Sequence, residues 1–249
     1  MKVVLFLLAD RSYYRDPLVA PGEIFCGPDV QNPDGVRTIR IPGGQPRYQD
    51  LAAQYPVLRD PDLVVVKADA TRRNFIRGIR ELNCRTLLLL GDTHHLERPI
   101  STMIQYAQEE QFELLTSEHD RHHLHWFEKA GFKNIIWLPC FSMNPYRMPP
   151  QPGWEFPLSF VGSTGPFHPY RNYILGKLQE WGYPLRVGTA PQQEAARIYN
   201  RSLISLNVSL NGDFNFRIFE ILAAGGFLLT DRLCEASGLS LLFEEGVHY

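Results

Sequence analysis

Short apolar runs recur along the first half of the chain, separated by longer segments of mixed polarity. The runs cover residues 3–8, 63–66, 86–90, 113–116 and 135–138 and are rich in Val, Leu and Ile. Strands that are buried on both faces read as continuous apolar runs, so this spacing is typical of a parallel sheet covered by helices. The first half of the chain is therefore predicted to be an α/β unit.

Between two of these runs, residues 71–83 carry apolar side chains at helical spacing. Phe75, Ile79 and Leu82 fall at i, i+4 and i+7, and four arginines take other positions. This pattern predicts an amphipathic helix whose arginine-bearing side faces solvent. In contrast, residues 13–46 are rich in Pro and Gly, and we expect a loop there around one strand at 36–41.

Five prolines interrupt the alternation of strands and helices between residues 142 and 157. Because proline lacks a backbone N–H and blocks regular elements, this stretch is predicted to be a linker between residues 1–141 and 158–249. Strand-like runs at 158–161, 185–187, 203–208 and 227–230 then alternate with helical patterns at 170–181, 192–201 and 214–224. The expected fold class is α/β with two Rossmann-like domains. The second domain is expected to be incomplete, since roughly 90 residues are few for a domain.

Composition and charge exclude several classes of protein. Hydrophobic residues make up 44% and charged residues 21% of the chain, so it has enough apolar material for a core. The formal net charge of −2 gives no global attraction to nucleic acid or to an anionic membrane. Four widely spaced cysteines without a CxxC pair favour a reducing compartment. We expect a cytoplasmic protein with no nucleic-acid partner and at most peripheral contact with the inner face of a membrane.

The first candidate site is the turn formed by Gly162, Ser163, Thr164 and Gly165, directly after the strand at 158–161. Such a turn presents backbone N–H groups at the carboxyl edge of the sheet, and the following helix, which carries Arg171, attracts phosphate at its N-terminus. The turn matches neither GxGxxG nor a Walker motif, so an ordinary strand-to-helix turn remains the alternative.

The second candidate site is the helix at 214–224. Residues 211–213 form a turn that can cap this helix, and Arg217 and Glu220 follow at i and i+3 near its start. Both side chains can face one ligand, while Ile218 and Ile221 pack inward. A simple Arg/Glu surface pair is the alternative.

These residues carry a resemblance to a known family. The segment 217–231, RIFEILAAGGFLLTD, resembles the donor-site motif of GT-B glycosyltransferases, in particular the family-4-like enzymes and their spore-maturation-protein-like relatives. The likeness spans roughly residues 85–249. It implies two Rossmann-like domains facing across a cleft, with an unknown glycan, lipid or protein acceptor on the first and a nucleotide-sugar donor on the second. It also implies a hexosyltransferase-type activity that retains the anomeric configuration and needs no metal or other cofactor.

The resemblance assigns roles to the candidate residues. Glu220 would bind the ribose hydroxyls, and Arg217 with the amides of Gly162, Ser163 and Thr164 would bind the diphosphate, a group that fixed cations and amide dipoles stabilise. The sequence also departs from the family.

At position 212, eight residues before Glu220, glycine replaces the acid that holds the sugar, and Asp213 is the expected substitute. The glycine-rich acceptor loop after the first strand is missing. The missing acid and the short second domain leave a non-catalytic nucleotide- or glycan-binding module as an alternative.

Six of the eight histidines form the third candidate site: His94, His95, His119, His122, His123 and His125. Asp92, His94 and His95 follow the strand at 86–90, and Asp10 follows the first strand, so these four are the expected catalytic residues on the acceptor side. A histidine there would act as general base if the enzyme inverts.

A metal site is the rival interpretation of the histidines. His119, His122 and His123 would share a helix face, and an Asp/His set could hold zinc, manganese or iron, which leaves a metal-dependent hydrolase as an alternative function. No tight ligand spacing supports this interpretation. We therefore expect no metal and a solvated histidine-rich helix at 119–125.

Overall fold

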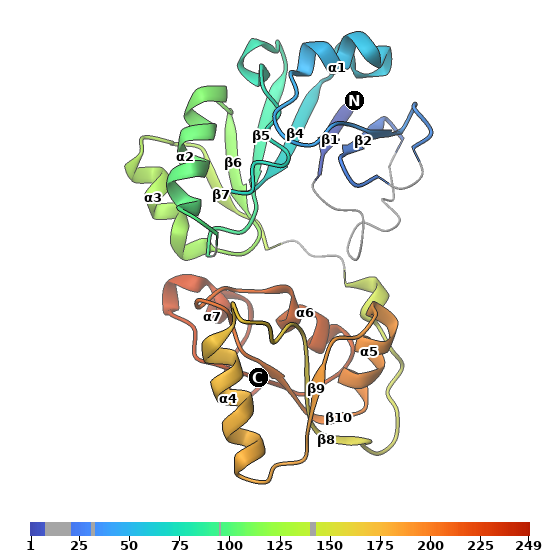
Figure 1. The fold of residues 1–249 in the computed structure, drawn as a ribbon, viewed down its shortest axis with the longest axis vertical. Coiled ribbons are helices and arrows are strands. Elements are labelled where there is room, and N and C mark those ends of the chain that lie inside the picture. The colour runs from blue at the N-terminus through green and yellow to red at the C-terminus, as the bar shows by residue number, and fades with distance from the viewer. Residues whose placement is uncertain (8–20, 31–32, 95, 140–142) are drawn as a thin grey trace. The chain divides into compact units, whose positions relative to one another are not determined.

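The computed structural model describes residues 1–7, 21–30, 33–94, 96–139 and 143–249 (Figure 1). The chain forms two compact units, Met1–Pro139 and Cys140–Tyr249, which we call the first and the second unit. Within the described ranges no helix is long and apolar enough to cross a membrane.

The first unit is built on a parallel sheet. Its described strands are β1 (Val3–Phe6), β2 (Glu23–Gly27), β3 (Thr38–Arg40), β4 (Leu63–Ala68), β5 (Arg85–Leu90), β6 (Leu114–Ser117) and β7 (Ile135–Trp137). They lie in the order β3-β2-β1-β4-β5-β6-β7, and all neighbouring pairs are parallel. The order reverses between β1 and β4, which is the arrangement of a Rossmann-like sheet.

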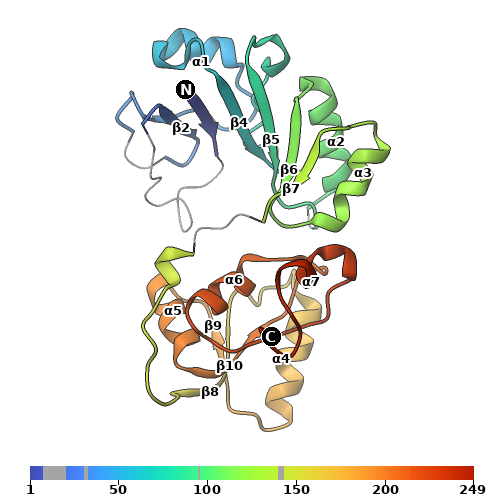
Figure 2. The same ribbon diagram turned by 180° about the vertical axis from the view of Figure 1, so that it is seen from behind.

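Three α-helices pack on this sheet in its described part, α1 (Tyr48–Gln54), α2 (Pro99–Glu110) and α3 (Leu124–Lys129), with short 3₁₀ turns η1 (Pro56–Leu58), η2 (Ile79–Glu81) and η3 (Arg121–His123). Figures 1 and 2 show α2 and α3 beside the β6–β7 end of the sheet. Val64 and Leu88 of the strands, Tyr106 of α2 and Phe127 of α3 are fully buried in one core. Alternate strand residues reach this core because successive side chains point to opposite faces.

Two sequence-based expectations for residues 13–83 are wrong. Residues 71–83 form no α-helix; residues 74–77 lie beside residues 44–47, with bridges at Gly44–Asn74 and Arg47–Arg77, and the 3₁₀ turn η2 follows. Gly78 has a φ of +78°, in the left-handed region, which a helix interior excludes. Arg77 forms ion pairs with Glu109 and Glu110 of α2 and is only partly exposed, whereas Arg72, Arg73 and Arg80 are exposed. The second error is β2, which the Pro- and Gly-rich composition of residues 13–46 concealed.

The second unit has a smaller parallel sheet. Its described strands are β8 (Phe156–Val161), β9 (Leu185–Gly188), β10 (Ser202–Asn207) and β11 (Leu228–Thr230), in the order β11-β10-β8-β9. The helices are α4 (Pro169–Glu180), α5 (Gln192–Asn200), α6 (Phe216–Ala223) and α7 (Leu239–Leu242), with 3₁₀ turns η4 (Asn144–Tyr146) and η5 (Glu235–Ser237). The sequence predicts every strand here, and α4, α5 and α6, to within two residues. The turn η4 packs against α5 and α6.

The strand order positions a binding edge in the second unit. The chain passes from β8 to β9 on one side and then returns to β10 on the other. The carboxyl ends of β8 and β10 therefore flank a topological switch point, which is where open α/β sheets bind ligands.

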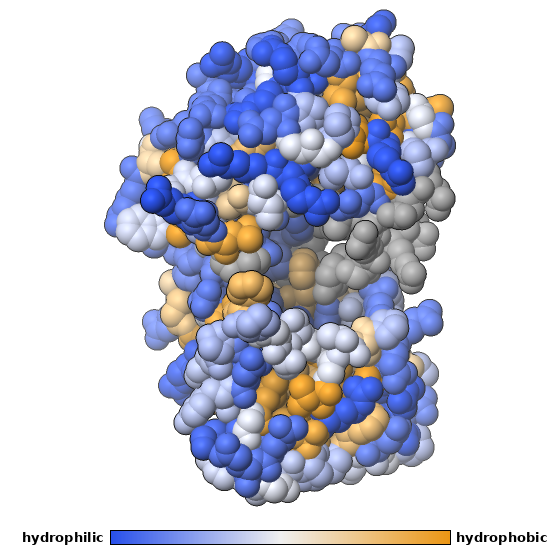
Figure 3. All heavy atoms as spheres, in the orientation of Figure 1, coloured by the Kyte–Doolittle hydropathy of each residue, from blue (hydrophilic) through white to orange (hydrophobic). Residues whose placement is uncertain are grey.

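Apolar side chains are also exposed on the second unit. A pocket of about 670 Å³ is lined by Ile174 of α4, Leu206 of β10 and Leu229 of β11, among others. Figure 3 shows apolar atoms gathered on the second unit, in the lower half of the view.

Candidate functional site

Arg217 ties together the two strand ends at the switch point of the second unit. It lies in the first turn of α6, where Asn215 caps the helix by accepting the Arg217 amide at 3.1 Å. Its Nε donates to the Val161 carbonyl at the end of β8 (2.7 Å), and its Nη1 donates to Asn207 Oδ1 at the end of β10 (2.9 Å). The guanidinium is thus fixed where the two strands diverge.

Arg171 makes a second bridge in the same place. It comes from α4, is only 5% exposed, and donates from Nε to the Val208 carbonyl (3.0 Å) and from Nη1 to the Ser163 carbonyl (2.8 Å). Burial, with the charge of Arg217, lowers the pKa of Arg171 to about 10, against the opposing charges of two aspartates. Arg171 therefore remains a cation at neutral pH.

The turn 162–165 lies against these two cations. Gly162 donates its amide to the Gly188 carbonyl (2.9 Å), which extends the β8–β9 pairing, so this amide is already engaged. Among the described residues, no acceptor meets the amides of Ser163, Thr164 and Gly165. Ser163 and Thr164 are exposed. The turn thus offers three amides to an anion.

Glu220 points into the interior of the second unit. It is 6% exposed; Oε1 accepts a hydrogen bond from the Tyr146 hydroxyl (2.9 Å) and Oε2 from the Tyr199 hydroxyl (3.3 Å). Burial and the charge of Glu220 raise the pKa of Tyr199, which keeps it a donor. Sequence reasoning missed both tyrosines, because they come from η4 and α5, far from Glu220 along the chain.

Asp213 is engaged within its own loop. It is buried, and its Oδ1 accepts the Leu210 amide at 2.6 Å. Gly212 has a φ of +79°, so the turn favours glycine at the position where the resembled family has an acid. Asp231, after β11, was also missed; it accepts hydrogen bonds from the amide (2.9 Å) and the hydroxyl of Ser209.

In the first unit, Asp120 organises the side chains that follow β5. Its Oδ2 accepts hydrogen bonds from the Thr93 amide (3.1 Å), the Thr93 hydroxyl (2.8 Å) and His94 Nδ1 (2.9 Å). Burial acts to raise the pKa of this fully buried carboxyl. The hydrogen bond and charge of His94 and the hydrogen bond of Thr93 outweigh that effect, so the pKa of Asp120 lies well below its usual value.

The ionised Asp120 fixes the tautomers of two histidines. A carboxylate only accepts, so His94 must donate from Nδ1 and Thr93 must give its single hydroxyl proton to Asp120. His123 Nδ1 lies 2.9 Å from the same hydroxyl oxygen and must therefore donate to it. Burial, together with neighbouring histidines, lowers the pKa of His123 against the opposing effect of Asp120. A ring held in this way carries its lone pair on Nε2 whenever it is neutral.

The remaining predicted residues of this region are only partly brought together. Asp92 Oδ1 lies 4.0 Å from Nε2 of the buried His119, whereas His94 bonds Asp120. Asp10 and His95 lie outside the described residues. The helix expected at 119–125 is wrong at its start: His119 precedes it, His122 and His123 belong to η3, and His125 begins the exposed part of α3.

Solved structures provide the comparison for this architecture. Sucrose-phosphate synthase from Thermosynechococcus elongatus is similar with a TM-score of 0.60 and 12% sequence identity, over 97% of this chain and 83% of that one. HepE from Anabaena, in complex with UDP and glucose, is similar with a TM-score of 0.61 and 12% identity, over 99% of this chain and 84% of that one. The chain has the GT-B fold. An α-glucosyltransferase in complex with UDP and DNA has a TM-score of 0.52 and 9% identity, over 92% of this chain and 79% of that one.

The second unit also matches by sequence. Residues 156–249 match a family model described as glycosyl transferase-like. The matched segment of this GT-B chain contains the turn 162–165 and Arg171, Arg217 and Glu220. A comparison with curated proteins gives no match.

Proposed function

We propose that the protein is a glycosyltransferase that takes a hexose from a UDP-sugar bound by the second unit. One observation carries the proposal: two fixed arginines and three unengaged amides meet at the switch point of the sheet. The family match over residues 156–249 and the UDP named for HepE support the choice of ligand. By resemblance we assign the chain to the spore-maturation-protein-like group. The acceptor, a glycan, lipid or protein, would bind the first unit.

The proposed chemistry follows from charge. Breaking the glycosidic bond to a nucleoside diphosphate leaves negative charge on the departing diphosphate. Arg217 and Arg171 are held in place before the reaction, and the amides of residues 163–165 add dipoles that need no reorganisation. Because fixed cations stabilise the leaving group, we propose transfer without a metal ion.

Glu220 can still serve the ribose in this proposal. Each of its carboxylate oxygens accepts one tyrosine hydroxyl, and a carboxylate has about four acceptor positions. We propose that the two ribose hydroxyls bind this carboxylate beside the tyrosines. The tyrosines would then orient the carboxylate rather than compete with the ligand.

The stereochemical outcome is proposed as retention, as the resemblance implies. Under inversion, His94 would be the general base that takes the proton from the incoming hydroxyl. Assigning the anomeric configuration of the product by NMR separates these two outcomes.

Calorimetric titration with UDP, GDP, ADP and TDP in the presence of a chelator tests the donor site. We expect UDP to bind, and Arg217→Lys to weaken binding about 10- to 100-fold, the scale of one lost charge-assisted hydrogen bond, because lysine lacks the fork that spans β8 and β10. Arg197→Lys is the matched control, since Arg197 forms its ion pairs with Glu155 and Glu194 rather than with residues of the switch point. The absence of binding, or equal affinity in the two variants, would contradict the proposed site. UDP binding without UDP release from any UDP-sugar would leave a binding module.

A further inference from the structure

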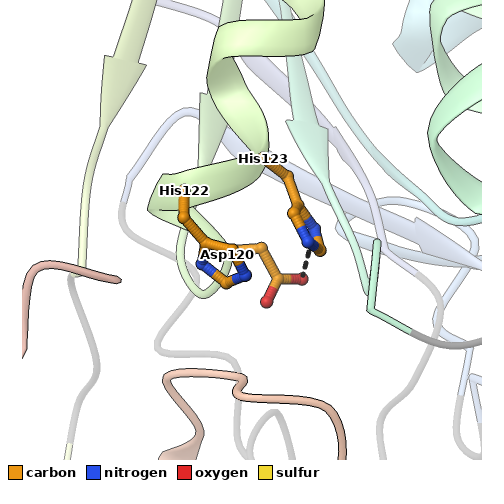
Figure 4. Close-up of side chains that lie close together, drawn as sticks. All are labelled: Asp120, His122 and His123. Atoms are coloured by element: carbon orange, nitrogen blue, oxygen red, sulfur yellow. Dashed lines mark ion pairs between the residues drawn. The ribbon is translucent and has the colours of Figure 1, made fainter. Parts of the chain in front are cut away.

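We propose that Asp120, His122 and His123 of the first unit bind a divalent transition-metal ion of the zinc class. One potential ligand atom of each residue lies within 4.8 Å of those of the other two. Figure 4 shows the rings of His122 and His123 on either side of the Asp120 carboxylate, below η3. All three residues belong to the first unit, so the site is distinct from the proposed donor site and does not depend on it.

The two oxygens of Asp120 have unequal surroundings. Oδ2 accepts three hydrogen bonds, whereas Oδ1 is buried and has no hydrogen-bond partner among the described residues. Leaving a charged oxygen buried and unpaired is costly, and a bound cation removes that cost. The hydrogen bonds to Oδ2 hold the carboxylate in position, so Oδ1 is presented to its surroundings in a fixed orientation.

The two histidines supply the matching ligands. Their ring centroids lie 4.1 Å apart. With Nδ1–H donated to Thr93, the His123 ring is oriented by a second residue, as metal-binding histidines usually are. Two imidazoles and one carboxylate suit zinc, cobalt, nickel or iron(II) rather than magnesium or calcium, which prefer oxygen ligands alone.

The geometry needs only a small closure of the side chains. Metal–ligand bonds of about 2.0–2.2 Å place the ligands of a tetrahedral site roughly 3.4 Å apart, closer than the outer limit of this cluster. Rotation of the exposed edges of the imidazoles brings them in. Three protein ligands leave one tetrahedral position open to water or another molecule, as in catalytic rather than structural zinc sites.

The test uses the full chain after removal of metal with a chelator. Zn²⁺ is titrated by calorimetry, and Co²⁺ by visible absorption, whose d–d bands report nitrogen and oxygen coordination. We expect one equivalent of each to bind, no comparable binding of Mg²⁺, and a Zn²⁺-dependent rise in the melting temperature, because an ion that binds only the folded state stabilises it.

Variants decide whether these residues are the ligands. Asp120→Asn and His122→Gln should each weaken Zn²⁺ binding at least 10-fold and abolish the rise in melting temperature. His125→Gln, which changes an exposed histidine of α3, should leave both unchanged. If Asp120→Asn does not fold, His122→Gln decides alone. Failure of the original protein to bind Zn²⁺, or equal affinity in His122→Gln and His125→Gln, would overturn the proposal, whatever the outcome of the nucleotide titration.

Discussion

Gly162 packs directly against the Arg217 guanidinium. A methyl group at this position would lie 3.1 Å from Arg217 Cζ, closer still to Nη2, and 3.2 Å from Phe160 Cζ. The Arg217 guanidinium is already stacked over the Phe160 ring, 4.6 Å from its centroid, so it can move away only by losing its bonds to Val161 and Asn207. At the scale of the residue, the absence of a side chain at Gly162 keeps the cation in place.

Gly162→Ala is therefore expected to weaken UDP binding about 10-fold or more, with a smaller loss of stability, because the displaced Arg217 loses hydrogen bonds worth about 1–3 kcal/mol. Calorimetric titration and thermal melting measure the two effects. Gly176→Ala in α4 is the control, since a methyl group there meets no described atom within 4 Å. Equal affinities in both variants would show that the position of Arg217 does not govern binding.

Residue type and spacing predicted Arg171, Arg217, Glu220 and His94, but not their partners. Asp120 follows β6 and bonds residues that follow β5, and Tyr146 and Tyr199 reach Glu220 from η4 and α5. The Asp120 contacts form only when parallel strands align their carboxyl ends, and the Glu220 contacts only when η4, α5 and α6 pack together. No local pattern in one sequence records either arrangement. The partners of a candidate residue could therefore be identified only from the structure.

At the scale of elements, prediction succeeded where local signals agreed. In the second unit, Gly and Asn turns separate β8, β9 and β10 from the helices that follow them, and the four strands and α4, α5 and α6 were predicted, whereas η4, η5 and α7 were not. Residues 71–83 failed because Phe75, Ile76 and Ile79 reach the core from a segment that is not α-helical, although its apolar spacing coincides with that of an α-helix. Gly78 was the local signal against a helix. The strand β2 was missed because five residues between Pro- and Gly-rich stretches give too short a pattern.

The helix α6, which carries Arg217, is capped at its start by Asn215. Asn215 accepts the Arg217 amide, while its own Nδ2 is buried without a hydrogen-bond partner in the described structure. Asn215→Ala should destabilise the protein by about 1 kcal/mol, the usual loss for a helix N-cap, whereas Asn215→Asp should keep the cap and remove the unpaired donor. Urea denaturation measures the free energy of unfolding of each variant, with Gln179→Ala on the exposed side of α4 as control. Equal stability of the alanine and aspartate variants would exclude a capping role.

At the scale of the whole molecule, each unit has its own core. Leu88 of β5 is buried among residues of the first unit, and Leu206 of β10 among residues of the second. We expect Leu88→Ala and Leu206→Ala each to cost about 2–5 kcal/mol within their own unit, which lowers that unit's melting temperature by on the order of 10 °C. Differential scanning calorimetry should show two transitions, with each variant lowering a different one.

Each ligand should raise the melting transition of the unit that binds it and leave the other transition unchanged. A ligand at 100 times its dissociation constant stabilises the unit that binds it by about 2.7 kcal/mol. UDP should therefore raise the transition that Leu206→Ala lowers, because Arg171, Arg217 and the turn 162–165 all belong to the second unit. Zn²⁺ should raise the transition that Leu88→Ala lowers, because Asp120, His122 and His123 belong to the first. A single transition that responds to both variants would mean that the two cores unfold together, and then binding to either site would stabilise the whole chain.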